Sequence, residues 1–433
     1  MPAPCGSDFI VASNRNQQYN HIFSHFHRER DINFAVMPHI IVRILICLGC
    51  IFSGLSSQAY VFDTTVRPAM AVPSAYMPLL KGKRVAIVVN QTSEYRGTHL
   101  LDQLLQEQVS VKRIFVPEHG FRGSADAGAH IASGTDSATG LPVISLYGKN
   151  KKPSGGQLAG IDVLVYDLQD VGVRFYTYIS TLQYCMEACA DAGISMVLLD
   201  RPNPNGFYVA GPVLDSAYAS FVGMQPIPVV YGMTPGEYAT MLAGERMMHT
   251  SHQLSLTVIP CINYTHSKKY RLPVAPSPNL RTMEAVYAYP SLCLFEGTPV
   301  SVGRGTDKPF CQYGAPELRS ISKHYFIPVP GYGAAKPPHQ HDTCYGEVVA
   351  PSPEEALAAI NNTLRIQWLI KAYKTYPTKS RFFTSFFTKL AGTPELERQI
   401  RAGMSEKEIQ NSWEPALDRF KAVRSRYLLY PDF

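Results

Sequence analysis

The chain has 433 residues, of which 45% are hydrophobic and 17% are charged, a composition typical of a folded globular protein. The formal net charge is +6, and the lysines and arginines are scattered, which argues against a nucleic-acid-binding groove. Because this length exceeds what one hydrophobic core usually serves, we expect two domains.

The amino-terminal region has the pattern of an exported protein. Residues 40–55 are apolar except for Arg43, and the small residues Ser57 and Ala59 follow in a cleavage-like spacing. A membrane span needs about 20 apolar residues, so a signal peptide fits better than a stable span. Met37 is a suitable initiator, and residues 1–59 are interpreted as an upstream extension and signal peptide. We expect a periplasmic or secreted protein; a lipid anchor at Cys50 fits the sequence less well.

Apolar runs and helical segments alternate after residue 80. The runs lack the alternation of half-exposed strands, as in a parallel sheet covered on both faces. We therefore predict a Rossmann-like, doubly wound, mostly parallel sheet over residues 80–283, a domain of α/β class. The predicted strands are 84–89, 111–116, 141–146, 161–166 and 195–199, and the predicted helices are 99–108 and 178–192.

The remainder of the chain has a different pattern. A proline-rich stretch, residues 273–278, lies near the predicted junction, and residues 284–433 are interpreted as a smaller α+β domain that completes a cleft. Ser352-Pro353-Glu354-Glu355 is typical of a helix start. Further helices are predicted over residues 368–376, 394–403 and 405–426.

The six cysteines beyond the leader give no sign of a metal or redox site. No Cys-x-x-Cys spacing occurs, which disfavours zinc and thioredoxin-like chemistry. Cys185 and Cys189 lie four residues apart on a predicted helix and are interpreted as small buried hydrophobic side chains. We expect no metal and no cofactor, and the sequence identifies no disulfide pair.

Polar clusters follow the predicted strands at their carboxyl ends. In open α/β sheets this rim is where ligands bind. The sequence therefore predicts a site at one rim, formed by 90–92, 118–119, 147–148, 167–170 and 200–205.

The segment Pro117-Glu118-His119-Gly120 has the most reactive composition. Burial after an apolar strand raises the pKa of a carboxyl group and suits Glu118 to donate a proton. Two alternatives stay open for Glu118, a loop cap or an ion pair with Arg122. His119 is predicted to orient Glu118 or contact the substrate, with a structural role as the alternative.

A second constellation spans residues 167–178. Its acids, amide, guanidinium and phenols match recognition of a sugar by hydrogen bonds and ring contacts. The alternative is an Asp170–Arg174 ion pair with Tyr176 in the core. The turn at residues 200–206 carries strong hydrogen-bond donors and acceptors, with Asx-turn chemistry as the alternative explanation. Since serine-hydrolase, dinucleotide, phosphate-loop and zinc-protease motifs are missing, a carboxylate-based hydrolase is favoured.

The order of these motifs resembles the NamZ-type exo-β-N-acetylmuramidases. The resemblance covers about residue 83 to the carboxyl terminus and includes Pro117–Gly120, Asp167–Tyr178, Leu199–Pro204, Gly232–Thr234, Gly303–Thr306 and Tyr427–Tyr430. It implies a Rossmann-like domain, a smaller second domain, and release of N-acetylmuramic acid from the non-reducing end of peptidoglycan fragments. It also implies that Glu118 is the catalytic acid. Tyr231 and Val302 depart from the family pattern, which usually has His and Glu there.

The implied substrate suggests roles for further residues. A lactyl carboxylate favours an arginine partner, and Arg122, Arg174, Arg201 and Arg304 stay open as alternatives. Asp170 is the preferred second catalytic group, ahead of Asp126 and Asp200, and retention or inversion stays open. The alternative function is a non-catalytic binding protein for cell-wall sugars. The other predicted substrate-binding residues are Tyr147, Gln169, Tyr176, Tyr178 and Asn203.

Overall fold

The computed structural model describes residues 62–118, 120–121 and 133–433, and its amino-terminal part forms a seven-stranded sheet. Six strands are parallel, and β5 pairs antiparallel with β6 at one edge. The prediction of a doubly wound, mostly parallel sheet is therefore confirmed. The strands in spatial order are β5 (Gly134–Thr135), β6 (Pro142–Ser145), β4 (Ser110–Val116), β1 (Arg84–Val89), β7 (Val163–Asp167), β8 (Ser195–Leu199) and β9 (Leu256–Ile259).

The strand order reverses beside β1. The chain runs from β1 to β4 and β6 on one side, and then returns to β7, β8 and β9 on the other. A doubly wound sheet offers a ligand crevice at the carboxyl ends of the strands near such a reversal. The loops after β4 and β7 are therefore placed to form a site, as the polar clusters predict.

Central strand β1 separates two hydrophobic cores. Val85, Ile87 and Val89 pack into the core beneath α2 (Pro73–Leu80) and α3 (Leu100–Gln106). Ala86 and Val88 point into the other core, with α5 (Tyr178–Ala192) and α6 (Pro235–Gly244). Because strand side chains alternate between faces, a continuous apolar run fills both cores, which is why the run predicts a covered strand. The short helix α4 (Gly155–Leu158) precedes β7.

Helix α5 connects the candidate site to the core. Its bounds match the prediction, and it ends at Gly193, whose φ of 64° is the left-handed conformation that favours glycine. Cys185 and Cys189 are both fully buried on this helix, as predicted. All six cysteines in the described part of the chain are unpaired.

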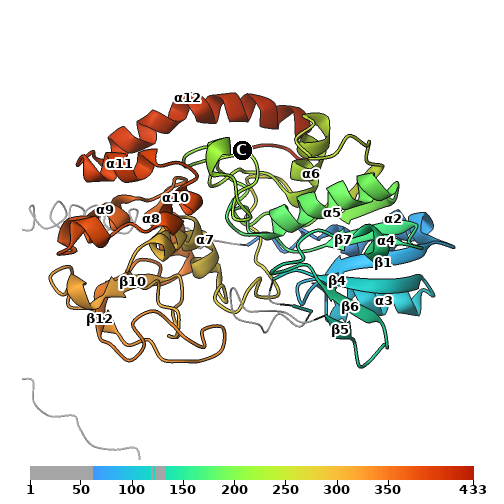
Figure 1. Cartoon of the computed structure of the whole chain (residues 1–433), viewed down its shortest axis with the longest axis horizontal. Helices are drawn as coiled ribbons and strands as arrows, with labels where there is room; N and C mark the ends of the chain where they lie inside the picture. Colours follow the sequence, from blue (N-terminus) through green and yellow to red (C-terminus); the bar gives the residue numbers. More distant parts are fainter. Residues whose placement is uncertain (1–61, 119, 122–132) are drawn as a thin grey trace, which may run out of the picture. The chain divides into compact units, whose positions relative to one another are not determined.

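The carboxyl-terminal part combines a small antiparallel sheet with helices. The sheet has the order β10 (Gln312–Ala315), β12 (Cys344–Val348) and β11 (Tyr325–Phe326). Figure 1 shows the helices of this part lying on one side of that sheet. The helices are α7 (Met283–Leu292), α8 (Pro353–Ile360), α9 (Gln367–Thr375), α10 (Ser385–Ala391), α11 (Glu395–Arg401) and α12 (Glu406–Arg424).

One hydrophobic core runs through both parts. It includes Ala86 and Leu198 of the large sheet together with Tyr313 of the small sheet and Phe420 of α12. The described residues from 62 onward belong to one compact unit, and the division between residues 283 and 284 stays a prediction. The predicted extension and signal peptide, residues 1–59, lie outside the described residues.

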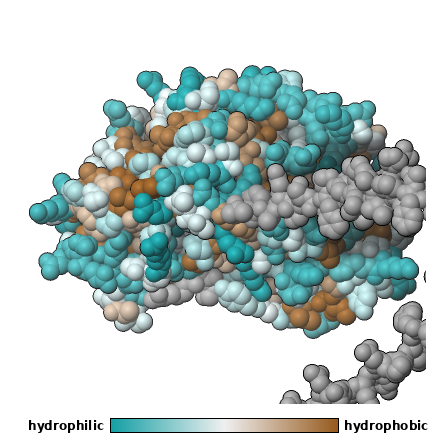
Figure 2. All heavy atoms as spheres, turned by 180° about the vertical axis from the view of Figure 1, so that it is seen from behind, coloured by the Kyte–Doolittle hydropathy of each residue, from teal (hydrophilic) through white to brown (hydrophobic). Residues whose placement is uncertain are grey.

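The surface mixes polar and apolar side chains. Figure 2 shows small hydrophobic areas separated by hydrophilic ones on the face opposite that of Figure 1. Among the described residues, no helix combines the length and the apolar character that crossing a membrane requires.

A further short antiparallel pair joins β2 (Glu94–Tyr95) to β3 (Thr98–His99) beside α3.

Candidate functional site

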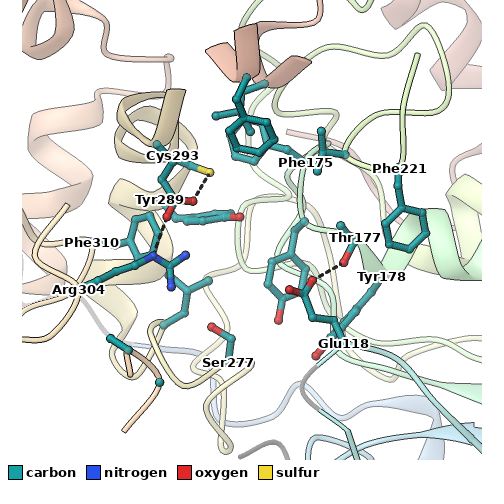
Figure 3. Close-up of a pocket in the computed structure, with 18 of the residues that line it drawn as sticks. Glu118, Phe175, Thr177, Tyr178, Phe221, Ser277, Tyr289, Cys293, Arg304 and Phe310 are labelled. Carbon is teal, nitrogen blue, oxygen red and sulfur yellow. Dashed lines mark hydrogen bonds and ion pairs between the residues drawn. The ribbon is translucent and has the colours of Figure 1, made fainter. Parts of the chain in front are cut away.

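A cavity of about 690 Å³ opens between the carboxyl-end loops of the large sheet and the carboxyl-terminal part. Glu118 and Tyr147 come from the loops after β4 and β6, and residues 175–178 come from the segment that leads into α5. The facing wall comes from α7, the following 3-10 turn and the segments around Arg304 and Lys336. Figure 3 shows Glu118 and Arg304 on opposite sides of this cavity.

Glu118 is held by hydroxyl groups. The Thr177 hydroxyl donates a hydrogen bond to Glu118 Oε2 over 3.0 Å, and the Tyr147 hydroxyl bonds the same carboxyl group. Burial, and then the charge of Glu118, raises the pKa of Tyr147, so that phenol stays a donor. Thr177 directly precedes α5, which ties it to a rigid element. Half-buried Glu118 is thereby fixed in position at the cavity wall.

Aromatic rings form much of the wall around Glu118. Tyr176 and Tyr178 lie edge to face with centroids 4.7 Å apart, and the Tyr176 hydroxyl donates to Pro276 O over 2.8 Å. Tyr147 packs against Phe221 at 6.4 Å. Such rings offer apolar faces to a sugar while their hydroxyls stay near its polar groups. The three tyrosines that the sequence predicted as substrate-binding residues thus line the same cavity.

The facing wall carries a fixed cation. Arg304 Nε donates to Glu296 Oε1 over 2.6 Å, and its guanidinium lies 4.9 Å above the Phe310 ring. The second oxygen of Glu296 accepts a weak bond from Cys293 Sγ at 3.5 Å. Burial raises the pKa of the Cys293 thiol, which favours its protonated form over the nucleophilic thiolate.

The other two described arginines with predicted substrate roles are used inside the protein. Arg201 binds Asp167 at two points, Nε to Oδ1 at 2.5 Å and Nη2 to Oδ2 at 2.8 Å. Arg174 donates to four backbone carbonyl oxygens, at Pro212, Ile227, Leu390 and Ala391. Both side chains are fully buried and neither lines the cavity. These contacts give both arginines a structural function, and their substrate roles stay predictions.

Two predicted amide side chains also lie behind the wall. Gln169 Nε2 donates to the carbonyl oxygens of Asp170 and Pro202, each over 2.8 Å. Asn203 accepts from Asn205 N and donates to Met233 O, as in the Asx-turn alternative. Gly172 packs on Asn203 so closely that an added Cβ would lie 2.1 Å from its Oδ1, at a φ of 74°. These residues shape the loops that carry the site.

Asp170 is buried and does not line the cavity. Its Oδ2 accepts from the Tyr231 hydroxyl at 2.5 Å and from Gly172 N at 2.6 Å. Burial raises the pKa of Asp170 to about 7, although these hydrogen bonds lower it. Tyr231, which replaces the usual family histidine, is thus a partner of Asp170. The catalytic role of Asp170 stays a prediction.

The structure does not describe all of the predicted site residues, and some residues that line the cavity were not predicted. His119, Arg122 and Asp126 are among the residues that the structure does not describe. Thr177 and Glu296 were not predicted as site residues, although Thr177 belongs to the constellation at residues 167–178. Five of its residues line the cavity: Glu118, Tyr147, Tyr176, Tyr178 and Arg304. No group of three or more potential metal ligands occurs in the described part.

A half-buried acid, aromatic walls and a guanidinium at the rim of a Rossmann-like sheet fit a glycoside hydrolase, and the comparisons with known proteins support this class. The family model "Exo-beta-N-acetylmuramidase NamZ, N-terminal" matches residues 85–284, and its "C-terminal" counterpart matches residues 287–430. The chain therefore belongs to the NamZ exo-β-N-acetylmuramidase family, which confirms the resemblance read from the motifs.

Relatives support the family assignment along most of the chain. "Peptidoglycan beta-N-acetylmuramidase NamZ" of Bacillus subtilis is 39% identical over 373 residues, covering 82% of this chain and 89% of that protein. A solved DUF1343 family protein from Bacteroides fragilis is 45% identical with a TM-score of 0.78, covering 85% of this chain and 99% of that one. A second Bacteroides fragilis structure of that family is 28% identical with a TM-score of 0.69, and the aligned regions cover 85% and 100% of the two chains.

Proposed function

We propose that this protein releases N-acetylmuramic acid from the non-reducing end of peptidoglycan fragments, with Glu118 as the general acid. The observation that carries this proposal is the position of Glu118, on a cavity wall and fixed by the hydroxyls of Thr177 and Tyr147. A general acid must reach the glycosidic oxygen that it protonates, and a fixed side chain at a cavity wall meets that requirement. The activity for which the Bacillus subtilis relative is named supports the same substrate class.

The cavity has a size that suits a small saccharide. Its volume of about 690 Å³ lies within the usual range for small-ligand sites, about 300–1,000 Å³. Aromatic rings beside Glu118 can pack on a sugar ring, and Arg304 supplies a cation on the other side. In the chemistry that we propose, Glu118 gives its proton to the leaving oxygen as the bond to the anomeric carbon breaks. Water supplies the hydroxyl group that ends on the anomeric carbon, and the remaining proton of that water restores Glu118.

The test is cleavage of para-nitrophenyl N-acetylmuramic acid by the protein and by its Glu118→Gln variant. A general acid contributes roughly 10²–10⁴-fold in rate, so we expect a loss of this size in kcat. Glu94→Gln is a matched control, because Glu94 lies in the short β2 strand and does not line the cavity. Full activity of a folded Glu118→Gln variant would contradict the proposal, and binding of the sugar without turnover by the unaltered protein would favour the binding-protein alternative.

We also propose that the protein acts outside the cytoplasm, in the periplasm or as a secreted protein. The apolar residues 40–55 and the small residues that follow support this proposal, although they lie outside the described part of the structure. Amino-terminal sequencing of the protein recovered from expressing cells tests it. A start at residue 60 is expected, and a cytoplasmic protein that retains residues 40–55 would contradict it.

A further inference from the structure

We propose that Arg304 binds the lactyl carboxylate of the substrate and that Glu296 holds Arg304 in position for this contact. This inference rests on the proposed function, because it names the group that selects a muramyl sugar over a sugar without the lactyl ether. It concerns the cavity wall opposite Glu118 (Figure 3).

The geometry leaves part of the Arg304 guanidinium free for a ligand. Its hydrogen bond to Glu296 uses Nε, and neither terminal nitrogen has a hydrogen-bond partner among the residues that the structure describes. Figure 3 shows the terminal nitrogens of Arg304 directed into the cavity. A guanidinium with both terminal amines available can bind a carboxylate through two parallel hydrogen bonds.

Glu296 and Phe310 hold this arginine in place. The Arg304 side chain is 17% exposed and that of Glu296 is 25% exposed, so the pair is largely shielded from bulk solvent. The Phe310 ring supports the guanidinium from one side. An arginine that is already ordered loses less side-chain entropy when it binds a ligand. Glu296 therefore acts through Arg304 and is a positioning residue.

The charges on the described wall match a monoanionic sugar. The charged lining residues of known position are the acids Glu118 and Glu296 and the cations Arg304 and Lys336. The facing wall, which carries Glu296, Arg304 and Lys336, therefore has one net positive charge. A sugar with one carboxylate neutralises that charge, whereas N-acetylglucosamine leaves it unbalanced in the cavity.

Two of the arginines that the sequence left open as partners of the carboxylate are already bound to other groups of the protein. Arg201 already binds a carboxylate, that of Asp167, and Arg174 is occupied by four carbonyl oxygens. Lys336 is exposed and supplies charge without the planar fork of a guanidinium. Arg304 is the described arginine that lines the cavity.

The experiment compares two chromogenic substrates that differ in the lactyl group, the para-nitrophenyl glycosides of N-acetylmuramic acid and N-acetylglucosamine. For Arg304→Gln we expect kcat/KM on the muramyl substrate to fall about 10- to 100-fold, mainly through KM, as for loss of a charged hydrogen bond. The ratio of kcat/KM on the muramyl substrate to kcat/KM on the glucosamine substrate should therefore fall. Arg304→Lys retains the positive charge without the planar fork of the guanidinium. Its kcat/KM on the muramyl substrate should lie between those of the unaltered protein and Arg304→Gln.

Variants of Glu296 separate positioning from general structural damage. Glu296→Gln keeps an oxygen that can accept from Arg304 Nε, and should change KM for the muramyl substrate less than Glu296→Ala does. In both variants any loss on the glucosamine substrate should be smaller than the loss on the muramyl substrate. An equal loss on both substrates, or an undiminished preference for the muramyl sugar in Arg304→Gln, would overturn the inference.

Direct binding distinguishes failure of this inference from failure of the proposed function. If the unaltered protein hydrolyses neither glycoside, calorimetry with free N-acetylmuramic acid and with its lactyl amide still tests Arg304. We expect the acid to bind more tightly than the amide, with this difference lost in Arg304→Gln. Equal affinity of the unaltered protein for the two sugars would reject the role of Arg304, whatever the enzyme hydrolyses.

Discussion

The Thr177 hydroxyl lies 3.0 Å from Glu118 Oε2, joining the start of α5 to the loop after β4. These residues are 59 positions apart in the chain, so the contact depends on the sheet bringing the two loops together. Because α5 packs along its length into the main core, the hydroxyl has a rigid support. The orientation of the candidate acid is therefore coupled to the core of the protein.

We predict that Thr177→Val lowers kcat for muramyl glycoside hydrolysis about 5-fold, the equivalent of one hydrogen bond of about 1 kcal/mol. Valine keeps the shape of threonine but cannot donate to Glu118, which then has one fewer fixed partner. Thr177→Ser retains the hydroxyl and serves as the control. Steady-state kinetics measure the effect. Equal losses in the two variants would mean that kcat responds to any change in packing at this position, and an undiminished kcat in Thr177→Val would contradict the prediction.

The buried pair of Arg201 and Asp167 leads to a prediction about stability. Asp167→Asn leaves a fully buried guanidinium without its counter-ion, which typically costs about 3–5 kcal/mol. We expect this loss in the free energy of unfolding measured with urea. Arg84→Gln, which breaks the exposed Arg84–Asp162 pair, is the control and should change stability little. Similar losses in both variants would mean that burial does not decide the effect.

Asp170 gives a prediction about pH. Its pKa rises through burial from 3.8 to about 7, so between these values the folded protein holds a proton that the unfolded chain has lost. This group's contribution to stability is complete below about pH 4 and is lost as the pH rises through about 7. Asp170→Asn cannot titrate. We therefore expect the melting temperature of the unaltered protein minus that of the variant to be greater at pH 4 than at pH 8.

The same variant tests the predicted catalytic role of Asp170. Asp200, whose pKa burial also raises to about 7, titrates in both proteins and so cancels from the comparison. If Asp170 only orders its loop, Asp170→Asn should retain far more kcat than Glu118→Gln. A loss as large as that of Glu118→Gln would support the catalytic role. If the difference in melting temperature between the unaltered protein and Asp170→Asn did not change with pH, titration of Asp170 near pH 7 would be contradicted.

The sequence was sufficient for the five inner strands of the sheet, because the local pattern of apolar residues carries that information. The runs at 84–89 and 195–199 have both faces buried, and their composition shows it without knowledge of their partners. Strand β9 was not predicted, since only Ile259 of its four residues is buried and the apolar run is short. The two-residue strand β5 is too short to have a pattern.

The arginines show why the site was only partly predictable. Arg174 and Arg304 both follow glycine-containing polar segments, and nothing local distinguishes them. Arg174 is buried because it meets carbonyl groups at Leu390 and Ala391, more than 200 residues away. Arg304 faces the cavity because Glu296 and Phe310 hold it there. Contacts of this range depend on tertiary structure, so residue type indicates the chemistry but not the location.

The last residues of the chain fasten it to the large sheet, and Tyr430 is central to that contact. Its hydroxyl donates to Asp200 Oδ2 over 2.6 Å and accepts from Cys261 N over 2.8 Å, at the carboxyl ends of β8 and β9. Tyr430→Phe removes the hydroxyl and leaves the buried Cys261 amide without that acceptor. Unsatisfied buried polar groups cost about 1–3 kcal/mol each, and we expect a loss of this size in urea unfolding.

Leu429→Ala is the matched control for this prediction, because that side chain is 46% exposed while its backbone amide bonds Glu237. We expect it to change the free energy of unfolding little. The slope of that free energy against urea should be the same in both variants, since the surface exposed on unfolding is unchanged. If Tyr430→Phe were as stable as the unaltered protein, the hydroxyl contacts would not contribute, and ring packing against Tyr264 at 5.0 Å would be what fastens the terminus.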